Sequence, residues 1–182
     1  MHILAISGSL RAGSSNTFLL QAAARLAPPD VEIRFYQGLG DIPPFNPDRD
    51  GEAVAPAVAD LRARLEQAAA VLISSPEYAH GISGVLKNAL DWLVDSGELV
   101  DKPIGLINAS PRATHAHAQL TEILTVMSGR IIPAASIAVP LLGKGHDPAG
   151  IVADPEIADP LRLALRALAA EAVQGTASTG AT

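Results

Sequence analysis

A ten-residue stretch near the N-terminus combines residue types that bind phosphate. It reads Ser-Gly-Ser-Leu-Arg-Ala-Gly-Ser-Ser-Asn over residues 7–16, between a short apolar run and an alanine- and leucine-rich segment. This order is typical of a strand, a loop and a helix N-terminus, where unpaired N–H groups and the helix dipole stabilise an anion. Arg11 adds a planar guanidinium that can donate two hydrogen bonds to phosphate oxygens. The other candidate phosphate ligands are Ser9, Ser14, Ser15 and Asn16.

The alternative for residues 7–16 is an ordinary strand-to-helix loop in which one serine caps the helix and Arg11 faces water. Serine, asparagine and glycine are common in turns and caps, so the stretch by itself leaves both interpretations open. Its spacing matches neither G-x-x-x-x-G-K-[ST] nor G-x-G-x-x-G. We therefore do not expect a P-loop nucleotide hydrolase or a dinucleotide-type Rossmann site.

A second stretch, residues 76–92, is richer in glycine, proline and polar side chains than a plain connection requires. Gly81 and Gly84 would let a planar ring approach the main chain. The N–H groups that begin the following helix would then stabilise negative charge on that ring. In the alternative interpretation, Tyr78 is only a core or interface aromatic and the ring site does not exist.

Several other reactive residue types are expected to be structural. Asp91 and Trp92 lie on the helix that follows the second stretch and turn away from its loop, which favours packing or subunit contact. His115 and His117 are two residues apart, a spacing that directs them to different sides of a helix and does not make a metal site. His80 is of more interest because it lies beside the expected ring.

Composition excludes several classes of protein. The 182 residues are 48% hydrophobic, enough for one well-buried core, and a formal net charge of −6 gives no general attraction for nucleic acid or anionic membrane. The absence of cysteine excludes disulfides, thiolate metal ligands and cysteine nucleophiles. The first residues show no basic region or cleavage site, and no apolar run reaches the length of a membrane span. We therefore expect a soluble cytoplasmic protein.

Apolar runs alternate with segments of helical periodicity along the chain. Residues 37–52 read as a surface loop, and residues 175–182 as a disordered tail. The predicted strands are 2–6, 31–36 as an edge strand, 70–73, 103–109, and 131–139 weakened by Pro133. The predicted helices are 17–26, 53–69, 82–94, 114–127 and 155–173.

Five strand–helix alternations predict a doubly wound α/β fold, a parallel sheet with helices on both faces. Ligands in such sheets bind outside the carboxyl ends of the strands. Three loops are expected to meet there, residues 7–16, 74–84 and 108–114.

Two motifs together resemble the NAD(P)H-dependent FMN reductase family of flavodoxin-like proteins. The family's G-S-L-R-x-x-S-x-N loop for the FMN phosphate is matched by Gly8, Ser9, Leu10, Arg11, Ser14 and Asn16. Its P-E-Y-N-x-x-x-P-G-x-L-K-N-A-I-D-W segment beside the isoalloxazine ring is matched by Pro76, Glu77, Tyr78, Gly84, Leu86, Lys87, Asn88, Ala89, Asp91 and Trp92. The departures are Ala79 for asparagine, Ser83 for proline and Leu90 for isoleucine.

The resemblance implies a flavodoxin-like sheet of five parallel strands in the order 2-1-3-4-5, with residues 1–174 as a single FMN-binding domain. It implies no catalytic side chain and no metal, because the chemistry belongs to the flavin. The implied cofactor-binding residues are Ser9, Arg11, Ser14, Ser15, Asn16, Pro76, Glu77, Tyr78, Ala79, His80, Gly81, Ser110 and Arg112.

The implied reaction passes a hydride from NADPH or NADH through FMN to a second acceptor, which is free flavin, a quinone, an azo compound or chromate. A homodimer or homotetramer is also implied, with Asp91 and Trp92 near a subunit interface. One alternative is a flavodoxin-type electron carrier, although such carriers flank the flavin with aromatic rings and this chain is only 3% aromatic. Another is a binding module that has lost the cofactor, which Ala79 keeps open.

Overall fold

A parallel β-sheet forms the centre of the molecule, which is a computed structural model describing residues 1–51, 54–141 and 147–179. Its strands follow the order β2-β1-β3-β6-β7, with β8 also paired to β6. This confirms the predicted order, because β6 is the fourth predicted strand and β7 with β8 replaces the fifth. The strands are β1 (His2–Ser7), β2 (Glu32–Phe35), β3 (Ala70–Ser74), β6 (Pro103–Asn108), β7 (Arg130–Ile131) and β8 (Ile137–Ala138).

The burial of each strand explains its place in the sheet. All residues of β3 and β6 are buried, as expected for central strands that helices cover on both faces. In β2, exposed Glu32 and Arg34 alternate with half-buried Ile33 and Phe35, and this strand forms the edge next to β1. The predicted edge strand is therefore confirmed.

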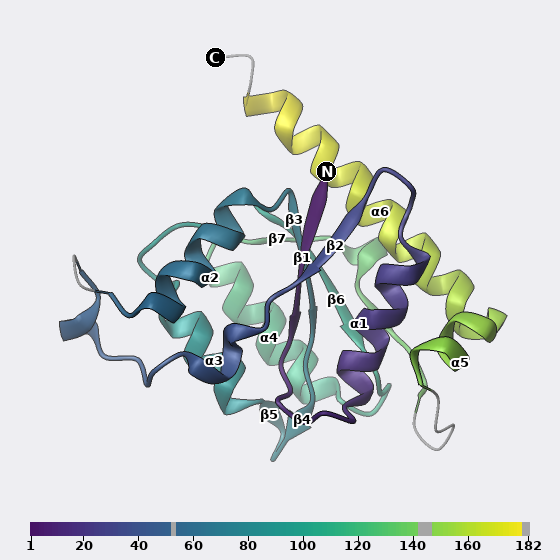
Figure 1. The fold of residues 1–182 in the computed structure, drawn as a ribbon, viewed down its shortest axis with the longest axis horizontal. Coiled ribbons are helices and arrows are strands. Elements are labelled where there is room, and N and C mark those ends of the chain that lie inside the picture. Colours follow the sequence, from purple (N-terminus) through teal and green to yellow (C-terminus); the bar gives the residue numbers. More distant parts are fainter. Residues whose placement is uncertain (52–53, 142–146, 180–182) are drawn as a thin grey trace.

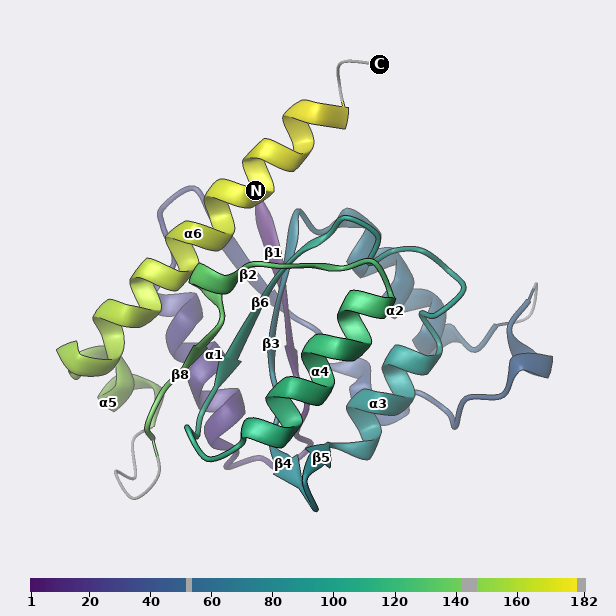
Figure 2. The same ribbon diagram turned by 180° about the vertical axis from the view of Figure 1, so that it is seen from behind.

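Helices cover both faces of the sheet (Figures 1 and 2). One face carries α1, α5 and α6, and the other carries α2, α3 and α4. The α-helices are α1 (Ser15–Leu26), α2 (Pro56–Gln67), α3 (Gly84–Asp91), α4 (Thr114–Val126), α5 (Pro148–Ala153) and α6 (Pro155–Thr179). The short 3₁₀ turns are η1 (Gly38–Asp41), η2 (Pro47–Arg49) and η3 (Pro133–Ala135).

Alternation along the strands assigns apolar side chains to both layers. Ile3 of β1 and Leu72 of β3 belong to the cluster under α1 and α6, whereas Leu4 and Val71 belong to the cluster under α2 and α4. Successive side chains of a strand point to opposite faces, so an unbroken apolar run fills two cores at once.

The structure corrects the predicted elements at five places. The fifth strand is interrupted at η3, because proline cannot donate to a strand ladder. Helix α2 begins at Pro56, a favoured first position, and residues 52–53 lie outside the described part. Helix α6 continues to Thr179, so the expected tail of residues 175–182 is helical up to Thr179. Gly175 does not end the helix, because a glycine lowers helix stability by only about 1 kcal/mol. Short helix α5 is absent from the predicted elements.

The fifth correction is a hairpin inside the second stretch, formed by β4 (Glu77–Tyr78) and antiparallel β5 (Gly81–Ile82). In Figure 1 it lies at the lower edge of the molecule, where β1 and β3 end. The three predicted site loops meet at this edge. No helix among the described residues combines the length and apolar character needed to cross a membrane.

Candidate functional site

The loop after β1 delivers the N-terminus of α1 to the edge where the strands end. Gly8 N donates to Ser74 O at 2.8 Å, which continues the β1–β3 pairing into the loop. Ser14 is the N-cap, yet its side chain makes no capping bond to a described N–H group, and the first turn holds no acidic residue. The first N–H groups of α1 therefore remain available to an external anion.

Gly8 lies where the first loop touches the second. A Cβ at this position would lie 2.8 Å from Ser75 Oγ and 3.1 Å from Ser75 Cα. A methyl group here would require Ser75 Oγ to move and the main chain of Ser75 to shift by a few tenths of an ångström, so glycine favours this close approach of the two loops.

An open cavity of about 380 Å³ joins the three loops. Its size lies within the range of small-molecule sites, roughly 300–1,000 Å³. The lining residues are Ser9, Arg11, Ser14, Ser15, Asn16, Ser75, Pro76, Glu77, Tyr78, Asn108, Ala109, Ser110, Arg112 and Ala113. Ten of the thirteen predicted cofactor-binding residues are in this lining, and Ala79, His80 and Gly81 lie outside it at the hairpin turn.

Two arginines give the cavity its charge. Arg11 from the first loop and Arg112 from the third are both exposed cavity-lining residues. Neither guanidinium forms a hydrogen bond or an ion pair with another described side chain. Free guanidinium groups beside a helix N-terminus are suited to a phosphate, since both favour negative charge.

Buried polar side chains connect the loops beneath the cavity. Ser74 Oγ donates to Asn16 Oδ1 at 2.9 Å, so Asn16 also ties α1 to the end of β3. Asn108 accepts from Ser110 N at 3.0 Å through Oδ1 and donates to Ala113 O at 3.0 Å through Nδ2. Sequence reasoning missed Asn108, although an asparagine at the end of a buried strand is a typical turn-forming residue.

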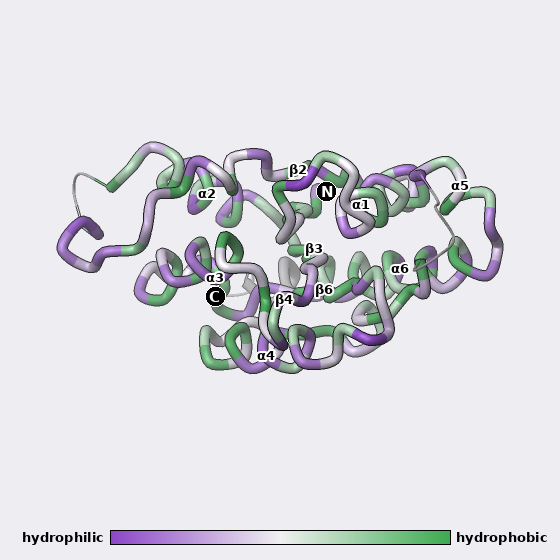
Figure 3. The backbone as a smooth tube through the Cα atoms, turned by 90° about the horizontal axis from the view of Figure 1, so that it is seen from below, coloured by the Kyte–Doolittle hydropathy of each residue, from purple (hydrophilic) through white to green (hydrophobic). Residues whose placement is uncertain are grey.

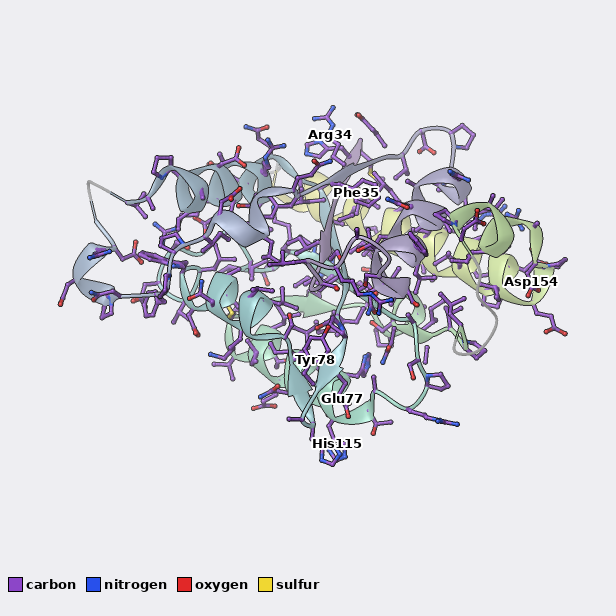
Figure 4. The ribbon with its side chains drawn as sticks, turned by 60° about the horizontal axis from the view of Figure 1, so that its bottom comes forward. Arg34, Phe35, Glu77, Tyr78, His115 and Asp154 are labelled. Atoms are coloured by element: carbon purple, nitrogen blue, oxygen red, sulfur yellow. The ribbon has the colours of Figure 1, made fainter. Side chains whose placement is uncertain are left out.

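Seen from the end that carries the hairpin, β4 lies between α1 and α4 (Figure 3). Tyr78 on β4 is 59% exposed, whereas its neighbour Glu77 is half-buried. Figure 4 shows Glu77 between Tyr78 and His115. The hairpin thus presents an aromatic ring near the cavity and a carboxylate toward α4.

Known proteins share this fold. The family model for NADPH-dependent FMN reductase matches residues 1–142. The chain belongs to this family. A solved structure of the flavoenzyme NAD(P)H:(acceptor) oxidoreductase FerB from Paracoccus denitrificans superposes with a TM-score of 0.82 at 27% identity, covering 95% of this chain and 97% of that one.

Curated relatives agree with the family. An NAD(P)H-dependent FMN reductase of Pseudomonas aeruginosa is 40% identical over 110 residues, 59% of each chain. The NADH:(hydroxy)cinnamate reductase subunit CrdA of Vibrio ruber is 35% identical over 152 residues, 80% of this chain and 73% of the relative. A quinone reductase of Escherichia coli is 34% identical over 105 residues, 57% of this chain and 54% of the relative. The matches to the first and third of these span little more than half of the relative's length.

FMN is the cofactor of this reductase family, and the residues of the cavity fit it. The free N–H groups of α1 and the guanidinium of Arg11 suit the phosphate. Gly8 adds no side chain of its own where it meets Ser75, at the junction of the two loops that would border the cofactor. NADPH or NADH is the co-substrate of the family.

The hairpin turn contains one departure from the family motif. Ala79 and His80 have φ values of 48° and 60°, the left-handed pair that a two-residue turn requires. Asparagine, which the family motif carries at the position of Ala79, tolerates this conformation better than alanine. Ala79 therefore keeps the turn at a cost in backbone strain.

Trp92 has a structural role in this chain. Its side chain is 1% exposed, its Nε1 donates to Pro43 O at 2.8 Å, and Phe45 meets it edge-on with ring centroids 5.1 Å apart. The packing interpretation of Trp92 is confirmed, and a position near a subunit interface stays a prediction. Asp91 instead forms an ion pair with Lys87 at 2.5 Å.

The histidines form no metal centre in the described ranges, where no group of three or more potential ligands gathers. His80 stacks on His115 with ring centroids 4.2 Å apart and an interplanar angle of 17°. The pair joins the hairpin turn to the first turn of α4.

Shifted pKa values lie away from the cavity. Burial raises the pKa of Tyr36 to about 12, and its hydroxyl donates to Ala57 O at 3.0 Å. Burial lowers the pKa of Lys102, whose Nζ donates to Ala68 O at 2.8 Å. Neither residue lines the cavity, so both belong to the scaffold.

Proposed function

We propose that this chain is an NAD(P)H-dependent reductase that holds FMN in the cavity and reduces a second small molecule there. The observation that carries the proposal is the convergence of Arg11 and the N-terminus of α1 on one cavity at the ends of β1 and β3. The bound flavin would supply hydride chemistry between a reduced nicotinamide and the acceptor. Free flavin, quinones, azo compounds and chromate are the proposed acceptors.

The protein residues bind and orient in this proposal. Arg11 and the hydroxyls of the first loop hold the phosphate, and the main chain of residues 76–78 borders the ring. Ser110 and Arg112 bind from the third loop, and Asn108 fixes that loop from below. Contacts of the cofactor with Ala79, His80 and Gly81 stay a prediction, because the turn lies beyond the cavity lining.

We also propose that residues 1–174 act as one flavin-binding domain in a cytoplasmic homodimer or homotetramer. Two exposed apolar side chains of the site loops, Leu10 and Tyr78, are each 59% exposed and suit contact with a second subunit. The net charge of −6 supports a small-molecule partner over nucleic acid or membrane. Sedimentation velocity with and without FMN tests the assembly.

The test of function uses the purified chain after FMN is added and unbound FMN is removed. Flavin absorbance should remain with the protein, and anaerobic NADPH or NADH should bleach it within seconds to minutes. Bleaching by dithionite but not by either nicotinamide would instead identify an electron carrier. Loss of all flavin on desalting, together with no binding in a titration, would identify a module without cofactor.

A further inference from the structure

The hairpin β4–β5 is hydrogen-bonded to α4 at two points. Glu77 Oε2 accepts from Ala116 N at 2.9 Å, and Gln119 Oε1 accepts from Ile82 N at 2.8 Å. Glu77 and Ile82 face each other as paired residues at the base of the hairpin. Both strands are thus bonded to one turn of α4, and we name this pair of bonds the α4 clasp.

Helix α4 depends on the clasp at its N-terminus. Its N-cap residue, Ala113, has no side chain that can accept a bond, and the first turn contains no acidic residue. Glu77, 39 residues earlier in the chain, supplies the missing acceptor. A carboxylate there satisfies an otherwise unpaired N–H group and faces the positive end of the helix dipole.

The hairpin depends on the clasp in turn. Left-handed conformation at Ala79 and His80 is unfavourable for residues with a Cβ, and such turns persist only where their surroundings fix them. A two-stranded hairpin of two residues per strand has little stability of its own. Contacts with α4 are therefore what hold it, including the stack of His80 on His115.

These contacts join two of the three loops that line the cavity. Glu77 lies next to Tyr78 in the second loop, and α4 begins directly after the third loop with Ser110 and Arg112. Figure 4 shows Glu77 on the side of Tyr78 that faces His115 of α4. A change at the clasp therefore changes the spacing of the second and third loops.

We propose that Glu77 and Gln119 are positioning residues that fix the hairpin against α4 and so set the width of the ring end of the flavin site. The carboxylate of Glu77 acts through Ala116 N rather than on the flavin. This inference rests on the proposed function, because the width matters only if a flavin binds there.

The experiment combines amide exchange in the apoprotein with titration of FMN and riboflavin. The variants are Glu77→Ala, Glu77→Gln, Gln119→Leu and the double variant Glu77→Ala/Gln119→Leu. Glu122→Ala is the matched control, because Glu122 is an exposed carboxylate on the same helix. Exchange is read by NMR at Ala116 N and Ile82 N, which need no cofactor.

Glu77→Ala should speed exchange at both amides and weaken FMN and riboflavin equally, by about 10-fold, because a charge-assisted bond at the ring end is lost. Glu77→Gln keeps an acceptor oxygen without the charge, so it should fold and weaken both flavins by only about 3-fold. The double variant should lose less affinity than the product of the two single losses, since both bonds hold one unit. Glu122→Ala should change neither the amide exchange rates nor the affinities for the two flavins.

Faster exchange at Ala116 N alone, with both flavin affinities within about twofold of the unmodified chain, would make Glu77 a local helix cap and overturn the proposal. Loss of FMN but not riboflavin affinity would also overturn it, because the effect would then lie at the phosphate. If the unmodified chain binds neither flavin, the proposed function fails. In that case the exchange at Ile82 N in Glu77→Ala still decides whether the clasp couples the hairpin to α4.

Discussion

The two ends of the cavity are built in different ways. At the end that we propose for the FMN phosphate, residues 7–16 continue directly from a central strand, Ser14 and Asn16 are buried, and Gly8 touches Ser75. At the end that we propose for the flavin ring, an exposed hairpin with a left-handed turn depends on side chains that reach α4. The first end is therefore fixed by main-chain packing and offers free charge, whereas the second is held by a few side-chain bonds.

This difference teaches where each kind of change should act. Main-chain crowding at the junction of the two ends should weaken the binding of both FMN and riboflavin. Loss of charge should weaken the binding of FMN alone, because riboflavin lacks the phosphate. Relief of backbone strain in the hairpin should change the stability of the fold, which urea denaturation measures.

The largest effect is expected from Gly8→Ala. The added methyl group would lie 2.8 Å from Ser75 Oγ and must push two loops apart, which should cost about 1–3 kcal/mol of unfolding free energy. FMN and riboflavin affinity should fall together, by roughly 10- to 100-fold. Gly13→Ala in the same loop is the control, because nothing described lies within 4 Å of the place that its methyl group would take, and its effect should be small.

Arg11→Ala should separate the two flavins. Arg11 is the cation of the first loop, and a hydrogen bond to a charged group contributes about 1.5–3 kcal/mol, so FMN affinity should fall by roughly 10- to 100-fold at low salt. Riboflavin affinity should stay unchanged. Flavin-fluorescence titration measures both, and equal losses for the two flavins would point to a folding defect instead of a phosphate site.

The smallest effect is expected from Ala79→Asn, which places a residue tolerant of left-handed backbone in the hairpin turn. Relief of strain at a φ of 48° should raise the unfolding free energy by about 1 kcal/mol. Urea denaturation measures it. Ala118→Gly on exposed helical backbone of α4 should shift stability by a similar amount in the opposite direction. A destabilised Ala79→Asn would mean that the turn is not strained.

Sequence patterns by themselves predicted the parallel sheet, and the resemblance to the reductase family implied its strand order, which the structure confirms. The same sequence predicted a phosphate site at the first loop, which stays a prediction. Apolar runs such as residues 70–73 are local patterns, and a short run of apolar residues without a polar face predicts burial on both sides. The first loop could also be singled out from the sequence, because the residue types expected to bind phosphate are adjacent in the chain. Residues 8–14 lie between β1 and α1, and Ser15 and Asn16 begin the helix whose N–H groups they accompany.

Only the tertiary structure decided the ring end and the role of several side chains. Glu77 bonds to a helix 39 residues away, Trp92 is enclosed by a segment 49 residues earlier, and Asn108 is fixed by the turn it supports. Local sequence carries propensities and patterns, whereas partners distant in the chain are set by the packing of whole elements, which no short motif encodes.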